Sequence, residues 1–86
     1  MTPTTPPLHG IRPLTDCMAG ERVRCTRLNA GHRARSRLTA MGVVPGAVLE
    51  ILRQNGRGPV LIALGESRFA LGRGIAEKIL VEPAHP

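Results

Sequence analysis

The chain is 86 residues long and has a formal charge of +6, from twelve basic and six acidic side chains. Its 42% of apolar residues suffices for one small core, which must be aliphatic because Phe69 is the only aromatic residue. No apolar run approaches the ~18–20 residues that span a bilayer, the N-terminal sequence lacks a signal-peptide layout, and two cysteines are too few for a disulfide scaffold. We therefore expect one cytoplasmic domain whose basic surface favours acidic partners.

The N-terminal segment, residues 1–12, is rich in proline and poor in apolar groups. A segment of this kind buries too little surface to offset the entropy of ordering. We expect it to be a flexible tail before one folded domain at residues 13–83, and residues 84–86 to form a short C-terminal tail.

The first strand is predicted at residues 21–28, where apolar and polar side chains alternate with the period of a half-buried strand. In this register Val23 and Cys25 face the core. Asn29 and Gly31 then break the pattern, as residues typical of turns do.

A short helix is predicted at residues 32–41, because Ala34, Leu38 and Met41 recur on one helical face. Gly42 follows at the position where a helix commonly ends in a left-handed residue. A helix this short needs contacts with the rest of the domain to persist.

The sequence Pro45-Gly46 predicts a type II turn, since proline presets the first central angle and glycine adopts the positive φ of the second. A strand follows at residues 47–54. Alternation places Leu49 and Ile51 on its core face.

Asn55-Gly56 predicts a hairpin turn after this strand. The remaining predicted elements are, in chain order, a strand at residues 59–64, a turn at 65–66, a strand at 67–71, a helical corner at 72–76 and a strand at 77–83.

Five short strands with turns between them, and one short helix after the first strand, indicate a mainly β fold in the form of a small barrel. Closure of the barrel would remove the exposed sheet edges of such a short chain. The predicted core consists of the apolar residues on the inner faces: Val23, Cys25, Leu38, Met41, Leu49, Ile51, Val60, Ile62, Leu64, Phe69, Leu71, Ile79 and Val81.

The order of these turns and caps resembles the FeoA family. The residues that carry the resemblance are Leu14 to Gly20-Glu21, Arg37-Leu38, Met41-Gly42, Pro45-Gly46 and the closing FALGRGIAEKILVEP. The resemblance implies a five-stranded SH3-like barrel, a fold also found as the C-terminal domain of some metal-dependent repressors. It further implies a cytosolic accessory of ferrous iron uptake that contacts the membrane transporter FeoB.

No catalytic or metal-binding set stands out. The acidic residues are scattered singly, and no nucleophile and base occur in a recognisable arrangement. The candidate metal ligands, which lack the paired spacing of metal motifs, are His9, His32, His85, Cys17 and Cys25. We expect no enzymatic activity, no metal site and no cofactor, and we interpret Cys25 as a small core residue.

Nucleic acid is the alternative partner class, whether for a small basic barrel or for a regulator-like domain. Arg33 and Arg37 lie one helical turn apart and could meet phosphates beside Arg22, Arg24 and Arg27. However, barrels that hold single strands stack bases on aromatic side chains, and Phe69, the one aromatic residue of this chain, is predicted to be buried. It also has no second helix for a helix-turn-helix.

A protein partner is the favoured interpretation. Val48, Leu52 and Leu61 fall on strand faces opposite the core, where a solvated face would normally be polar. With Arg33 and Arg37 they form the predicted partner-binding surface. The partner implied by the family resemblance is the cytosolic region of FeoB; self-association and an anionic membrane surface are secondary candidates.

Overall fold

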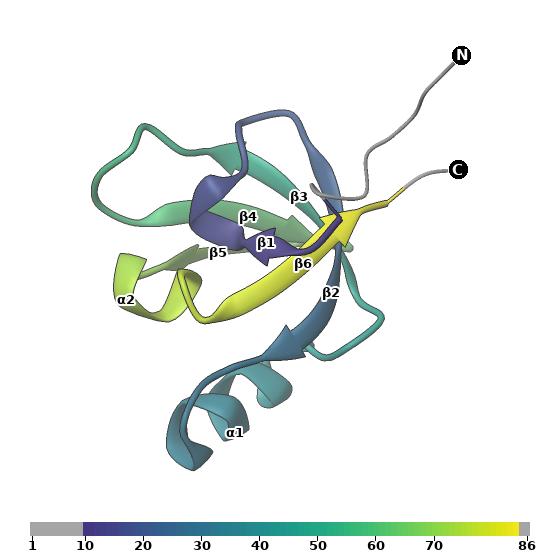
Figure 1. Cartoon of the computed structure of the whole chain (residues 1–86), viewed down its shortest axis with the longest axis vertical. Coiled ribbons are helices and arrows are strands. Elements are labelled where there is room, and N and C mark those ends of the chain that lie inside the picture. Colours follow the sequence, from purple (N-terminus) through teal and green to yellow (C-terminus); the bar gives the residue numbers. More distant parts are fainter. Residues whose placement is uncertain (1–9, 85–86) are drawn as a thin grey trace.

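The structure is a computed structural model and describes residues 10–84 (Figure 1). Its elements follow one another in the order β1 (Arg12–Pro13), the 3-10 helix η2 (Leu14–Asp16), β2 (Arg22–Leu28), α1 (His32–Ala40), β3 (Val48–Arg53), β4 (Val60–Leu64), β5 (Ser67–Leu71), α2 (Arg73–Ala76) and β6 (Ile79–Pro83). The mainly β fold class predicted from the sequence is confirmed, with α2 at the predicted helical corner.

All strand pairings are antiparallel and join six strands into one sheet in the order β1-β6-β2-β3-β4-β5. Residues 10–84 therefore contain six strands and not the predicted five, because Arg12 and Pro13 pair with Val81 and Leu80. The predicted closure of the barrel also differs from the structure. The sheet stays open, with β1 and β5 at its two ends, and the two-residue β1 includes a proline that cannot donate a ladder hydrogen bond.

The predicted N-terminal tail overlaps this first strand. Arg12, its last residue, lies in β1, whereas residues 1–9 fall outside the described part of the chain. At the other end, the N–H of Ala84 donates to the carbonyl of Arg22 at 3.0 Å, and residues 85–86 are not described.

The core lies on the inner face of the sheet, where the alternation of each strand places it. Three residues from the predicted core, Met41, Leu64 and Phe69, are only partly buried and pack against it. Sequence alternation also missed four buried residues outside the strands. The buried set is Leu14, Cys17, Val23, Cys25, Leu38, Val43, Leu49, Ile51, Val60, Ile62, Leu71, Ala76, Ile79 and Val81.

The corner between α1 and β3 is built from two glycines and a turn. Gly42 ends the helix with φ +93°, and the N–H of Val43 returns to the carbonyl of Leu38 at 2.9 Å. At the turn, Gly46 has φ +97° and the N–H of Ala47 donates to the carbonyl of Val44 at 2.9 Å. The corner therefore sets the distance between α1 and the sheet.

The connection from β3 to β4 is longer than the predicted hairpin turn. It covers residues 54–59, with positive φ at both Gly56 and Gly58. Asn55 does bend the chain, since its Oδ1 accepts from the N–H of Arg57 at 3.2 Å. The Gln54 side chain holds the loop by donating to the carbonyl of Thr15 at 2.9 Å.

Candidate functional site

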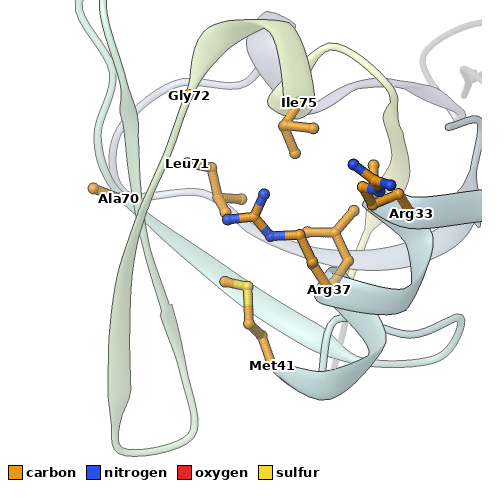
Figure 2. A pocket seen from close by; sticks show the side chains of 9 residues that line it. Arg33, Arg37, Met41, Ala70, Leu71, Gly72 and Ile75 are labelled. Carbon is orange, nitrogen blue, oxygen red and sulfur yellow. The ribbon is translucent and has the colours of Figure 1, made fainter. Parts of the chain in front are cut away.

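The described surface contains a groove between α1 and the sheet. Its volume is about 390 Å³. One wall is α1, and the opposite wall is the end of β5 together with α2; Figure 2 shows Arg33 and Arg37 projecting from α1 towards Leu71 and Ile75. The lining residues are Arg33, Ala34, Arg37, Leu38, Met41, Ala70, Leu71, Gly72 and Ile75. We call this hollow the α1–β5 groove.

The groove exists because α1 meets the sheet at few points. Leu38 is the one residue of α1 that is fully buried, and Figure 1 shows the helix standing apart from the strands. Arg33 and Arg37 are exposed and follow one another by four residues, so both reach the groove from the same side of α1. The groove therefore has an apolar floor with two cationic side chains above it.

Neither arginine of the groove is neutralised within residues 10–84. The ion pairs in this part of the chain join Arg12 to Glu21 and Arg24 to Glu82. Arg33 also lies in the first turn of α1, which contains no acidic residue, and a cation is unfavourable near the positive end of a helix dipole. The charge of Arg33 therefore does not serve the stability of α1 and is available to a ligand.

The five residues of the predicted partner-binding surface are not brought together. Arg33 and Arg37 share the α1–β5 groove, whereas Leu61 lines a smaller hollow with Arg53, Arg57 and Ala70. Val48 and Leu52 line neither hollow, and Leu52 lies where the register between β3 and β4 shifts.

The two leucines and the valine of the predicted surface are also less exposed than the alternation of the strands indicated. Val48, Leu52 and Leu61 are half-buried. In the described chain the large apolar residues that stand exposed are Ile11 and Met18, at 59% and 70% of their surface. The apolar strand face that we predicted is therefore only partly accessible to a partner.

Sequence reasoning missed the second wall of the groove. Leu71 was assigned to the core and Ile75 to a helical corner, and nothing in their spacing places them opposite α1. Their position opposite α1 depends on the path of the chain from β2 to β5, and the spacing of residues within one element carries no information on that path.

Both cysteines, which were candidate metal ligands, are buried and form no disulfide. Cys17 and Cys25 expose 2% and 1% of their surface. Burial raises the pKa of Cys17 to about 11, with the nearby Arg12 charge opposing it, and burial also raises the pKa of Cys25. Within the described residues no three His, Cys, Asp or Glu side chains gather as a metal site; His9 and His85 lie outside them.

We expect both thiols to react slowly in the folded protein, because the thiolate is the reactive form and burial disfavours it. With Ellman's reagent at pH 8, labelling of Cys17 should be on the order of a hundredfold slower than that of an unhindered thiol, and labelling of Cys25 should also be slower. When urea unfolds the protein, both thiols should become reactive together. Cys17→Ala and Cys25→Ala each leave one thiol, so the two labelling rates can be measured separately; fast labelling of either native thiol would contradict the burial.

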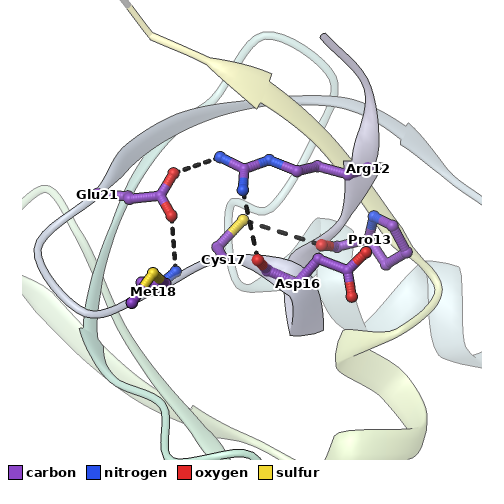
Figure 3. A network of polar contacts seen from close by, with 6 residues as sticks. All are labelled: Arg12, Pro13, Asp16, Cys17, Met18 and Glu21. Atoms are coloured by element: carbon purple, nitrogen blue, oxygen red, sulfur yellow. Dashed lines mark hydrogen bonds and ion pairs between the residues drawn. The ribbon is translucent and has the colours of Figure 1, made fainter. Parts of the chain in front are cut away.

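A polar network holds the N-terminal edge of the sheet (Figure 3). Arg12 forms an ion pair with Glu21 and donates to the carbonyl of Asp16 at 3.3 Å. The second carboxylate oxygen of Glu21 accepts from the N–H of Met18 at 2.7 Å. The network thus ties β1 and η2 to the residue before β2, which is a structural role and not a site for chemistry.

This network predicts a pH dependence of stability. Burial alone would raise the pKa of Glu21, but the hydrogen bonds from Met18 and Arg12 and the Arg12 charge outweigh it and lower the pKa. Because the folded pKa lies below the unfolded value, the contribution is present above about pH 4.3 and is lost as the pH falls through the folded pKa.

We therefore expect the wild type to lose more stability than Glu21→Gln between pH 5 and pH 2. The difference should be about 1 kcal/mol or less, because both side chains are partly exposed. Urea unfolding followed by circular dichroism measures it. Glu66→Gln, an exposed residue of the β4–β5 turn, is the control; if it flattened the pH dependence as much as Glu21→Gln, the ion pair would not be the cause.

No helix among the described residues is long and apolar enough to cross a membrane. Buried polar or charged residues are likewise absent from this part of the chain. The feature of this surface that suits binding of a ligand is the apolar α1–β5 groove with Arg33 and Arg37 at its rim.

Comparison with known proteins adds to this geometry. The model of the FeoA domain family matches residues 12–83. A protein of Methanocaldococcus jannaschii, named provisionally as Fe(2+) transport protein A, is 43% identical over 72 residues, which cover 84% of this chain and 87% of the relative.

Solved structures show the same fold. The crystal structure of an iron uptake regulatory protein (FeoA) has a TM-score of 0.81 at 34% identity, with 86% of this chain and 99% of that chain covered. A manganese-dependent transcriptional repressor has a TM-score of 0.80 at 23% identity, with 94% of this chain and 44% of the repressor covered. At that identity the repressor shows a shared fold and nothing more.

Proposed function

The chain belongs to the FeoA domain family, and we propose that it is a cytoplasmic, non-enzymatic accessory of ferrous iron transport that acts by binding the cytosolic region of a FeoB-type transporter. The observation that supports binding is the α1–β5 groove, an apolar hollow whose two arginines have no acidic partner within residues 10–84. Such a surface suits contact with another protein.

The proposed mode of action is a population shift. An accessory protein can change a transporter only if it binds one conformation of it better than the others. The groove and its arginines would supply the differential contacts. The half-buried Leu52 and Leu61 of the outer strand face form a second proposed contact surface.

The experiment is binding between two purified proteins from the same organism, the full chain and the cytosolic region of its FeoB. Isothermal titration calorimetry should give a defined stoichiometry, and deletion of the gene should lower ferrous iron uptake in cells. Absence of binding to every nucleotide state of the cytosolic region would refute the proposed function.

The outer strand face is tested separately. Leu52→Asp and Leu61→Asp should weaken complex formation by about tenfold, which corresponds to about 1.4 kcal/mol of lost contact. Because both side chains are half-buried, the melting temperature of each free variant is measured first. Equal binding by folded variants and wild type would remove this face from the proposal and leave the groove.

A further inference from the structure

Among residues 10–84, β5 is an edge strand with one free side. It lies at one end of the sheet, and the pairing that the described residues give it is with β4 alone, from Ser67 opposite Leu64 to Leu71 opposite Val60. In an antiparallel ladder every second residue directs its N–H and C=O away from the partner strand. An exposed edge of this kind is a template for a further strand from another chain.

The end of this edge strand is also a wall of the α1–β5 groove. Ala70, Leu71 and Gly72 line the groove opposite Arg33 and Arg37 (Figure 2). The end of an edge strand, an apolar floor and two arginines without an acidic partner in residues 10–84 are thus combined at one hollow. These three features are complementary to three parts of an extended peptide: its backbone, an apolar side chain and carboxylates.

We infer that the α1–β5 groove holds an extended acidic segment of a partner protein, which joins the sheet as a seventh strand beside β5. Main-chain hydrogen bonds to the β5 edge supply affinity, and alternate side chains supply specificity. Carboxylates of the segment meet Arg33 and Arg37, and a nearby apolar side chain of the segment enters the groove beside Leu71 and Ile75. The assignment of this segment to the transporter rests on the proposed function. The argument from the chemistry of the groove is independent of that function.

The spacing of the arginines fits such a segment. Residues four apart on a helix have Cβ atoms about 5–6 Å apart. Alternate residues of a strand lie about 6.6–6.8 Å apart and share one face. Two carboxylates in the pattern acidic-x-acidic therefore match Arg33 and Arg37, and the next residue on that face is the apolar one.

Charge decides between a partner segment and a second copy of this chain. The chain carries a net charge of +6, so pairing of two β5 edges would bring two sets of Arg33, Arg37 and Arg68 towards each other. Like charges placed together disfavour that association. An acidic segment relieves the same repulsion and is the occupant that the groove selects.

The probe is a capped, fluorescently labelled peptide with the central sequence Leu-Thr-Glu-Thr-Glu-Thr-Leu, which presents the same pattern in either strand direction. Fluorescence anisotropy with the full 86-residue chain at low ionic strength measures its affinity. Replacing both Glu by Gln, or both Leu by Ala, should each weaken binding by about tenfold. Equal affinity for the Gln peptide would overturn the role of charge.

The matched protein variants separate the groove from the overall charge. Arg33→Glu/Arg37→Glu should lower the affinity for the acidic peptide by more than tenfold. Arg27→Glu/Arg35→Glu makes the same change in net charge at exposed positions that do not line the groove, and should change it by less than about threefold. Equal losses in the two double variants would show nonspecific attraction and overturn the site.

Strand addition is tested by methylating the peptide amides one at a time. If the peptide pairs with β5, methylation should weaken binding at every second residue and leave the intervening residues unaffected. Nuclear magnetic resonance shifts should fall on residues 33–41 and 67–75. A loss without this alternation, or shifts elsewhere on the sheet, would overturn strand addition. A concentration-dependent dimer that excludes the peptide would assign the groove to a second copy.

The two proposals fail in different ways. If the wild type binds the transporter's cytosolic region and Arg33→Glu/Arg37→Glu binds it equally well, the groove assignment is wrong and the proposed function stands. If the wild type binds the acidic peptide in the groove but no form of the transporter, the proposed function is wrong and the groove assignment stands.

Discussion

Leu49→Ala, Ile51→Ala and Ile62→Ala are each expected to destabilise the fold by about 2–5 kcal/mol. All three side chains are fully buried, and each substitution removes three carbon atoms from the buried aliphatic core. Natural domains are stable by about 5–15 kcal/mol, and the smallest ones lie towards the lower end. Some of these variants should therefore be largely unfolded at 37 °C.

Thermal and urea unfolding followed by far-ultraviolet circular dichroism measures this effect, because the chain has no Trp or Tyr for fluorescence. The control is Leu61→Ala, which truncates a half-buried side chain on the neighbouring position of β4 and should cost clearly less than Ile62→Ala. If Leu61→Ala cost as much as Ile62→Ala, β4 would present its other face to the core.

Gly42→Ala is the second substitution expected to have a large effect, and for two reasons. Gly42 has φ +93°, a conformation that costs an L-residue about 1–2 kcal/mol. An added Cβ would also lie 3.0 Å from Cδ2 of Leu64, so this side chain would have to shift within a packed region. The expected loss is about 2 kcal/mol or more.

Gly46→Ala provides the matched control, because Gly46 has φ +97° but open space around an added Cβ. It should show the conformational cost alone. The excess cost of Gly42→Ala should shrink in a Leu64→Ala background, which a double-mutant cycle of urea unfolding measures. Equal losses at Gly42 and Gly46, with no coupling to Leu64, would mean that the contact is not limiting.

Local patterns predicted the strands well because their inner faces are filled by simple alternation. Val23 and Cys25 of β2, and Leu49 and Ile51 of β3, are buried as the period of two requires. Leu14, Val43 and Ala76 are equally buried but lie in a 3-10 turn, a helix end and a four-residue helix, where no periodicity develops. Burial there follows from the path of the chain and not from its pattern.

The sheet edges were the least predictable part of the fold. Two residues are too few for a strand signal, and Pro13 argues against one, so β1 becomes visible only through its pairing with β6. Likewise, the open edge of β5 is a property of the whole strand order. A sequence shows that strands exist more readily than it shows which of them lack a neighbour.

The family resemblance seen in the turns and caps is confirmed by the family model and by the relative that is 43% identical. The candidate site was predictable only in part. The helical spacing of Arg33 and Arg37 placed them side by side, while the facing wall of Leu71 and Ile75 required the tertiary structure. Fold and family could thus be predicted from short local signatures, whereas the groove could not.

The place of β6 between β1 and β2 has a consequence for biosynthesis. Cys25 of β2 pairs with Val81 of β6, far along the chain, so β2 has only one of its two neighbours until Ile79–Pro83 has left the ribosome. At synthesis rates of about 5–20 residues per second, the nascent chain exposes the unsealed side of β2 for several seconds. Contacts between residues so distant in sequence also form slowly. We therefore expect the ribosome-bound chain to expose a strand edge of β2 that the folded sheet covers, and such an edge favours aggregation.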